Sequence, residues 1–164
     1  MSYRDITVEM YKTAKPKTGK VMIMDYVEND GKKYFVDNSK VIYKHSKREI
    51  EVAYLLNEIF GGDVKVLPNI NFPQGIKTSD YIFRNERIDL KTIISKRNKD
   101  CLKTSLRNKE RQAHNFIIDN TAKKVSTESM IKQMKEIYEL KGFLWVDTIY
   151  LLENKNFIKI FKRK

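Results

Sequence analysis

The stretch GIKTSDYIFRNERIDLKTII, residues 75–94, decides how this chain is expected to fold. Two runs rich in β-branched and aromatic residues, at 80–83 and 87–94, flank a short polar turn at 84–86. Runs of this kind on either side of a turn predict a β-hairpin. The segments on both sides of it are therefore expected to add strands and helices to a sheet that contains this hairpin.

The charged side chains of the hairpin are expected to meet on one face. Asp89 and Lys91 are two residues apart on a strand, so their side chains point to the same face. With the turn centred near Asn85, Asp80 falls opposite Asp89 or Leu90. Two nearby carboxylates resist ionising together unless a cation intervenes, and hard oxygen ligands suit Mg²⁺ or Mn²⁺. The hairpin is therefore a candidate metal site, in which Lys91 would orient a water or stabilise negative charge.

A helix is predicted from Ser46 to about Phe60. Ser46 and Glu49 match the S-x-x-E capping box, and the Gly-Gly pair after Phe60 is a stop signal. At about 100° per residue, Glu49 falls inside the apolar arc of this helix and Glu51 falls outside it. An acid on a core-facing arc is unusual. Glu49 is therefore a candidate third acid of the metal site, with the capping-box role as the alternative.

The rest of the chain predicts a mixed α/β order, in which helices flank a central sheet. Residues 1–44 are interpreted as a small β-rich N-terminal extension or lobe, and residues 45–164 as the main domain. A second helix is expected from Ser126 or Thr127 to about Leu140, and a basic, helix-prone stretch at 98–111. Further strands are expected at 21–27, 33–36, 41–43, 64–67, 115–119, 146–152 and 156–162.

Composition narrows the class of protein. The 164 residues include 33 Lys and Arg against 21 Asp and Glu, so the formal net charge is +12. Such an excess favours an anionic partner, with nucleic acid as the first candidate. A hydrophobic share of 41% with few Gly and Pro excludes a disordered or collagen-like chain. One cysteine excludes a disulfide framework, and no apolar run reaches membrane-spanning length, so no membrane partner is expected.

A few other residues carry weaker signals. His45 and His114 are candidate general bases for a metal-free RNase. Trp145 is a candidate base-stacking residue, but its place beside an apolar strand favours the core. Cys101 lies in a basic, polar stretch where nothing places the histidine and acid that a nucleophile needs.

The order Glu49, Asp80, Asp89-Leu90-Lys91 resembles the PD-(D/E)xK nuclease superfamily. Ser79 departs from the pattern, since proline often stands at that position. More narrowly, the chain resembles the C-terminal nuclease domains of CdiA-type contact-dependent inhibition toxins and related phage or mobile-element proteins. The segments that carry this second resemblance, over roughly 45–160, are HSKREIEVAYLL, VLP, GIKTSDYIF, DLKTI and RQAHNFIID.

The resemblance implies a restriction-endonuclease-like mixed sheet flanked by helices. It also implies a metal-dependent endonuclease that cuts nucleic acid, with tRNA as the leading substrate and DNA as the other. Mg²⁺ or Mn²⁺ is the implied cofactor, with other divalent metals open. The implied catalytic residues are Glu49, Asp80, Asp89 and Lys91, of which the three acids hold the metal. Gln112 matches a polar position of the same core, and the expected substrate contacts are Gln112, Lys96, Arg97, Arg107, Lys109 and Arg111.

A toxin of this kind implies a cognate, acidic immunity protein and action in the cytoplasm of a target cell after delivery. Two alternatives stay open from the residues themselves. One is a nucleic-acid-binding protein without catalysis that uses the same basic surface. The other is a metal-free, histidine-based RNase, whose activity would survive a chelator and Asp80→Asn.

Overall fold

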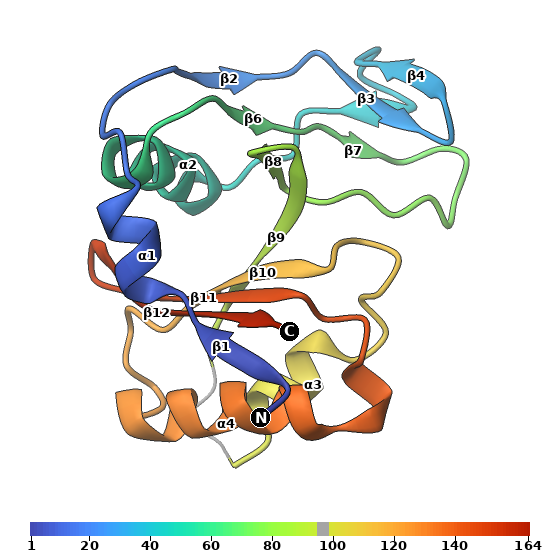
Figure 1. The fold of residues 1–164 in the computed structure, drawn as a ribbon. Coiled ribbons are helices and arrows are strands. Elements are labelled where there is room, and N and C mark those ends of the chain that lie inside the picture. The colour runs from blue at the N-terminus through green and yellow to red at the C-terminus, as the bar shows by residue number, and fades with distance from the viewer. Residues whose placement is uncertain (95–98) are drawn as a thin grey trace. The chain divides into compact units, whose positions relative to one another are not determined.

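The computed structural model describes residues 1–94 and 99–164, and it has the expected α/β class, with a large mixed sheet flanked by helices and small strands (Figure 1). Its contacts divide the chain into two units. Unit 1 contains residues 1–12, 89–110 and 114–164, and unit 2 contains residues 13–88 and 111–113. The strand β9 (Glu86–Thr92) contributes its first residues to unit 2 and its last residues to unit 1.

The sheet of unit 1 holds the most deeply buried part of the chain. Its parallel pair is β10 (Asn115–Asp119) and β11 (Thr148–Glu153), in which every residue is buried. The antiparallel strand β12 (Asn156–Arg163) follows β11, and β1 (Tyr3–Asp5) pairs with β12 at the edge. On the other side of β10, the amide of Ile93 donates to the carbonyl of Asp119, which connects the end of β9 to this sheet.

The helices of unit 1 are α1 (Thr7–Lys12), α3 (Cys101–Leu106), α4 (Thr127–Glu139) and the 3₁₀ turn η1 (Lys141–Phe143). Helix α4 begins where Ser126 accepts a hydrogen bond from the amide of Ser129, which satisfies one free donor of the first turn. It buries the apolar stripe Met130, Met134, Ile137 and Tyr138. The predicted second helix is therefore confirmed.

Unit 2 is built around the predicted hairpin. Strand β8 (Tyr81–Phe83) pairs antiparallel with β9 and with β6 (Val64–Val66), and β6 pairs in parallel with β2 (Val21–Ile23). The turn residues Arg84 and Asn85 both have positive φ, at 51° and 64°. Two consecutive left-handed residues are the geometry that matches the twist of paired strands. Two small sheets complete the unit: β3 (Tyr26–Asn29) with β4 (Lys32–Phe35), and β5 (Val41–Ile42) with β7 (Asn69–Ile70).

Helix α2 (Lys47–Phe60) also belongs to unit 2 and begins and ends where the sequence predicts. Ser46 accepts a hydrogen bond from the amide of Glu49, and Val52, Ala53, Leu56 and Phe60 are buried. Gly61 ends the helix at φ 77°, and a Cβ there would overlap the carbonyl of Lys15. Only glycine meets both constraints without strain.

Three expectations about local structure differ from the structure. The N-terminal segment holds a helix, α1, with no buried residue, so it has no apolar periodicity to reveal it. The run 21–27 is divided between β2 and β3, because β2 pairs with β6 and β3 pairs with β4. Of the basic stretch 98–111, the described residues 99–111 contain the short helix α3. The division at residues 1–44 and 45–164 stays a prediction.

Candidate active site

The most distinctive charged pair of unit 1 is Asp89 and Lys91 on β9. Their side chains lie on the same face of the strand, and Lys91 Nζ is 2.6 Å from Asp89 Oδ2. The side chain of Asp89 is 5% exposed and that of Lys91 is 19% exposed. A charge pair of this kind has lost most of its hydration, so each charge depends on the other. The D-x-K pattern therefore forms the juxtaposition that the sequence predicts.

Unit 2 places the other two acids near one buried tyrosine. Tyr81 follows Asp80 in the chain, is fully buried, and donates from its hydroxyl to the carbonyl of Glu49 at 2.6 Å. The first turn of α2 is thus attached to the start of β8. Glu49 and Asp80 are both half-buried, whereas Glu51 is exposed and pairs with Arg48 at 3.2 Å. The helical projection therefore separates Glu49 and Glu51 correctly.

Each of the three acids, taken by itself, has donor atoms that suit a hard cation. The carboxylate oxygens of Glu49, Asp80 and Asp89 are the donors that Mg²⁺ and Mn²⁺ prefer. Asp89 combines that chemistry with burial, which favours a cation at its side. Among the described residues, no group of three or more His, Cys, Asp or Glu side chains is gathered so as to hold a metal ion. The three-acid metal site stays a prediction.

Buried polar atoms mark two further residues of unit 2. In the part of the chain that the structure describes, both ring nitrogens of His45 and the side-chain oxygen of Gln112 are enclosed without a hydrogen-bond partner. Burial lowers the pKa of His45, which favours the neutral imidazole. A buried acceptor without a partner carries a cost, so Gln112 is suited to receive a ligand. The expected role of Gln112 as a substrate contact remains open.

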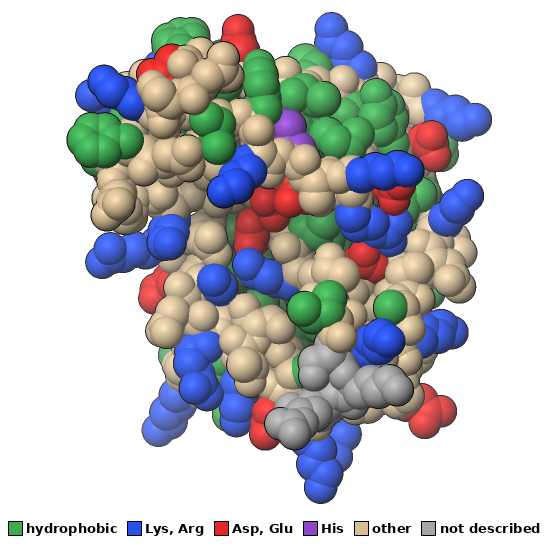
Figure 2. All heavy atoms as spheres, turned by 180° about the vertical axis from the view of Figure 1, so that it is seen from behind, with side chains coloured by type: hydrophobic (Ala, Val, Ile, Leu, Met, Phe, Trp, Pro, Cys, Tyr) green, Lys and Arg blue, Asp and Glu red, His purple; other side chains and the backbone are tan. Residues whose placement is uncertain are grey.

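The basic residues expected to contact substrate fall in different places. Arg107 and Lys109 belong to unit 1 and Arg111 to unit 2, with Arg107 and Arg111 exposed and Lys109 half-buried. Lys96 and Arg97 lie outside the described residues. Figure 2 shows Lys and Arg side chains spread over one face of the molecule.

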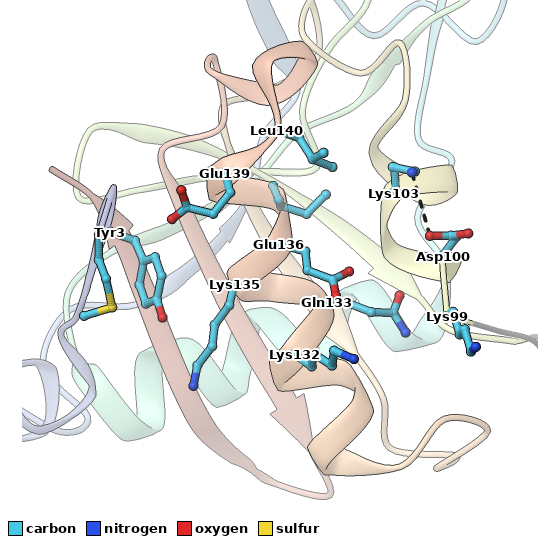
Figure 3. Close-up of a pocket in the computed structure, with 12 residues that line it drawn as sticks. Tyr3, Lys99, Asp100, Lys103, Lys132, Gln133, Lys135, Glu136, Glu139 and Leu140 are labelled. Carbon is cyan, nitrogen blue, oxygen red and sulfur yellow. Dashed lines mark ion pairs between the residues drawn. The ribbon is translucent and has the colours of Figure 1, made fainter.

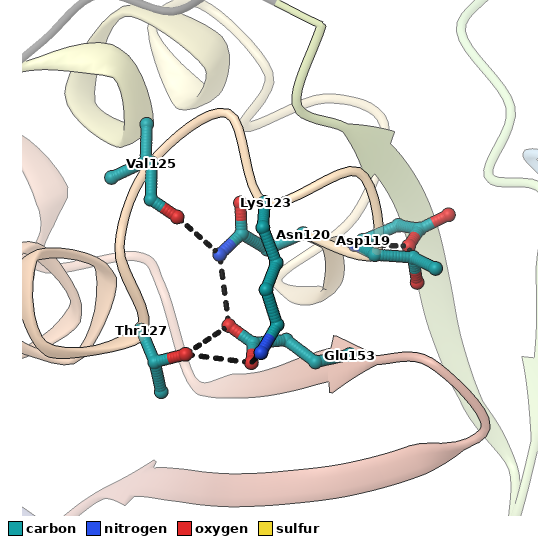
Figure 4. Close-up of polar contacts among 7 residues, drawn as sticks. Asp119, Asn120, Lys123, Val125, Thr127 and Glu153 are labelled. Atoms are coloured by element: carbon teal, nitrogen blue, oxygen red, sulfur yellow. Dashed lines mark hydrogen bonds and ion pairs between the residues drawn. The ribbon is translucent and has the colours of Figure 1, made fainter.

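A second buried acid of unit 1, Glu153, was not identified from the sequence. It accepts hydrogen bonds from Thr127 at 2.8 and 2.7 Å and from Asn120 at 2.9 Å, with Lys123 Nζ 3.9 Å away (Figure 4). The Asn120 amide also donates to the Val125 carbonyl. Both oxygens of Glu153 are thus engaged by the loop after β10 and by the start of α4. This arrangement ties the loop to β11 and has the character of a structural contact.

A pocket of unit 1 lies beside α4, with α3 and β1 as its other walls (Figure 3). Its volume is about 440 Å³, and Lys99, Lys103, Lys132 and Lys135 contribute to its lining. Gln133 connects the helices below it, accepting from the Leu102 amide at 3.0 Å. The neighbouring Cys101 is buried, and burial raises the pKa of its thiol. A thiol in this environment is a poor nucleophile.

Comparison with known proteins gives one match. Residues 77–157, just under half of the chain, match the family model of the contact-dependent growth inhibition CdiA C-terminal domain. This supports the narrower of the two resemblances, and it includes the hairpin with Asp80, Asp89 and Lys91. The wider PD-(D/E)xK superfamily is not confirmed by it. Searches of curated proteins and of solved structures gave no match.

Among the described residues, none of the helices combines the length and the apolar character that crossing a bilayer requires.

Proposed function

We propose that this chain is the effector domain of a contact-dependent inhibition toxin and that it hydrolyses phosphodiester bonds in nucleic acid, with tRNA as the leading substrate. The match of residues 77–157 to the CdiA C-terminal domain supports the toxin role. The single observation that carries the nuclease role is the buried pair of Asp89 and Lys91 within that match. Delivery into a target cell and a cognate immunity protein, which we expect to be acidic, belong to the same proposal.

The proposed chemistry assigns a role to each residue. Asp89, Asp80 and Glu49 supply carboxylate oxygens to Mg²⁺ or Mn²⁺. A bound divalent cation polarises the phosphate and lowers the pKa of its water. Lys91, fixed by Asp89 at 2.6 Å, keeps its ammonium where negative charge develops in the transition state. Tyr81 positions Glu49 through the backbone bond at 2.6 Å.

The pairing of Asp89 and Lys91 has a second consequence for this chemistry. A lysine held by a buried carboxylate loses little conformational freedom when substrate binds. Preorganised charge of this kind stabilises a transition state without the reorganisation that water would need. The burial of Asp89 therefore supports an electrostatic role for Lys91.

The test is cleavage of purified total tRNA and of plasmid DNA by the full chain, each with Mg²⁺, Mn²⁺ or EDTA. Asp89→Asn is compared with Asp5→Asn, whose partner Lys159 lies 2.8 Å away on the surface. Glu49→Gln is compared with Glu51→Gln on the same helix. We expect metal-dependent cleavage that Asp89→Asn and Glu49→Gln abolish and the two control variants retain.

Other outcomes would contradict the proposal in different ways. Cleavage that survives both EDTA and Asp89→Asn would replace it with a metal-free RNase, for which His45→Gln is then the decisive variant. Salt-sensitive binding without cleavage of either substrate would favour a binding protein. If Asp5→Asn and Glu51→Gln lost as much cleavage activity as Asp89→Asn and Glu49→Gln, the variants would be acting through folding.

A further inference from the structure

A second cleft of unit 1 lies beside the chain's single tryptophan. Its volume is about 270 Å³, and its lining comes from two segments. The segment after α3 contributes Arg107, Asn108 and Glu110, and the segment around η1 contributes Gly142, Phe143 and Trp145. Ligand pockets usually measure about 300–1,000 Å³, so this cleft has room for a single ring system.

The indole ring of Trp145 is fixed in place while part of it stays accessible. Its Nε1 donates to the carbonyl of Gly142 at 3.0 Å. The ring packs edge-on against buried Phe116, with centroids 5.8 Å apart, and lies 6.1 Å from Phe143. Trp145 is nevertheless only half-buried. The indole N–H is therefore satisfied within the protein, and Trp145 contributes to the lining of the cleft.

We propose that this Trp145 cleft binds an unpaired nucleobase of single-stranded nucleic acid. The proposal rests on the proposed nuclease function and adds a substrate contact away from Asp89 and Lys91. Bases stack on aromatic side chains irrespective of sequence, and arginine adds cation–π attraction and charge for a phosphate. The exposed guanidinium of Arg107 lies in the same lining as the tryptophan, which is the combination that recognises a nucleotide rather than a purely apolar ligand.

Glu110 indicates which nucleobases the cleft would prefer. Its carboxylate lines the same cleft and would repel a phosphate. It can accept hydrogen bonds from the exocyclic amino group of adenine or cytosine. The base therefore enters the cleft and its phosphate stays at Arg107. Adenine and cytosine are expected to bind more tightly than uracil, which has no such amino group.

Trp145 itself reports the binding. Asp89→Asn protein is titrated with AMP, with UMP and with ribose 5-phosphate, and the tryptophan fluorescence is followed. The expected result is saturable quenching by AMP, weaker quenching by UMP, and none by ribose 5-phosphate, which has the phosphate but no base. Equal responses to AMP and ribose 5-phosphate would overturn the proposal, and so would no response to any of them.

Gly142→Leu adds bulk to the lining of the cleft at a position where a new side chain meets no steric overlap. A Cβ on Gly142 meets no atom within 4 Å, so the new side chain extends into open space. The affinity for a fluorescently labelled single-stranded RNA hexamer, read by anisotropy, should fall about 5- to 150-fold, the range for losing one stacked base. Arg107→Ala should weaken it as well, whereas Arg4→Ala, at another exposed arginine, which pairs with Glu9, should not.

Trp145→Phe separates stacking from packing. Phenylalanine keeps an aromatic face, so Trp145→Phe should largely retain hexamer binding. Trp145→Leu should lose hexamer binding, although its melting temperature should equal that of Trp145→Phe. Unchanged hexamer affinity in both Gly142→Leu and Arg107→Ala would overturn the proposal. A failure of the proposed nuclease function would give a different result, because the wild-type chain would then leave both tRNA and DNA intact.

Discussion

Lys91→Met should destabilise the protein far more than the same change at Lys159. Each lysine pairs with an aspartate at almost the same distance, 2.6 Å to Asp89 and 2.8 Å to Asp5. The Asp89 side chain is 5% exposed, whereas the Asp5 side chain is 41% exposed. Removing one partner of a buried pair costs about 3–5 kcal/mol, and exposed pairs are worth about 0.2–1 kcal/mol. We expect about 3 kcal/mol for Lys91→Met, because Lys91 keeps some contact with solvent.

Urea unfolding, followed by circular dichroism, measures the difference. With a slope of about 2 kcal/mol per molar urea, Lys91→Met should lower the midpoint by about 1.5 M, and Lys159→Met by about 0.5 M at most. The double variant Asp89→Asn, Lys91→Met removes both charges and should recover part of the loss. Equal midpoints for the two lysine variants, or a double variant no more stable than Lys91→Met, would refute the claim that buried charge governs this pair.

Mn²⁺ at about a hundred times its dissociation constant should raise the unfolding free energy of the wild type by about 2.7 kcal/mol and leave Asp89→Asn unchanged, as read from urea midpoints. Tyr81→Phe should cost about 1 kcal/mol by the same measurement and slow single-turnover cleavage, since it removes a positioning hydrogen bond. Glu153→Ala should cost about 3 kcal/mol without changing the cleavage rate per folded molecule, because Thr127 loses its acceptor and Asn120 loses one of its two. Burial lowers the pKa of His45 in the folded state, so the unfolded chain takes up its proton first as pH falls below about 6.5. Stability should therefore decrease from pH 7 to pH 5, and His45→Phe should reduce that decrease in urea midpoints taken at both pH values.

Local signals explain what could be predicted of the fold. The sequence predicts the bounds of helix α2 well, because the serine cap, the helical spacing of apolar residues and the glycine stop all lie in or next to the helix itself. The hairpin was located because its turn and both strands are contiguous. Helix α1 lacked such a signal, since it buries no side chain. Residues 21–27 are divided into two strands because β2 pairs with the distant β6 while β3 pairs with β4. The local sequence of 21–27 does not indicate this choice of partners.

The same distinction applies to functional residues. Asp89 and Lys91 could be paired from their spacing alone, because a strand fixes the direction of side chains two residues apart. Trp145 was expected in the core from its apolar neighbours, but it lies before β11 begins and is half-exposed at a cleft. The cleft is formed with residues 107–110, and nothing local to Trp145 indicates that segment.

Burial of an acid alone does not distinguish a functional carboxylate from a structural one, as Asp89 and Glu153 show. Both side chains are 5% exposed. Both oxygens of Glu153 lie within hydrogen-bond distance of the single hydroxyl of Thr127, and one of them also accepts from the amide of Asn120, so its charge stabilises the loop. Asp89 is instead paired with another charged side chain, Lys91, two residues further along the same strand. A buried carboxylate and ammonium that stabilise each other cost more than apolar residues of the same size. That cost is explained if the pair acts on a charged substrate, which is the role we propose for it.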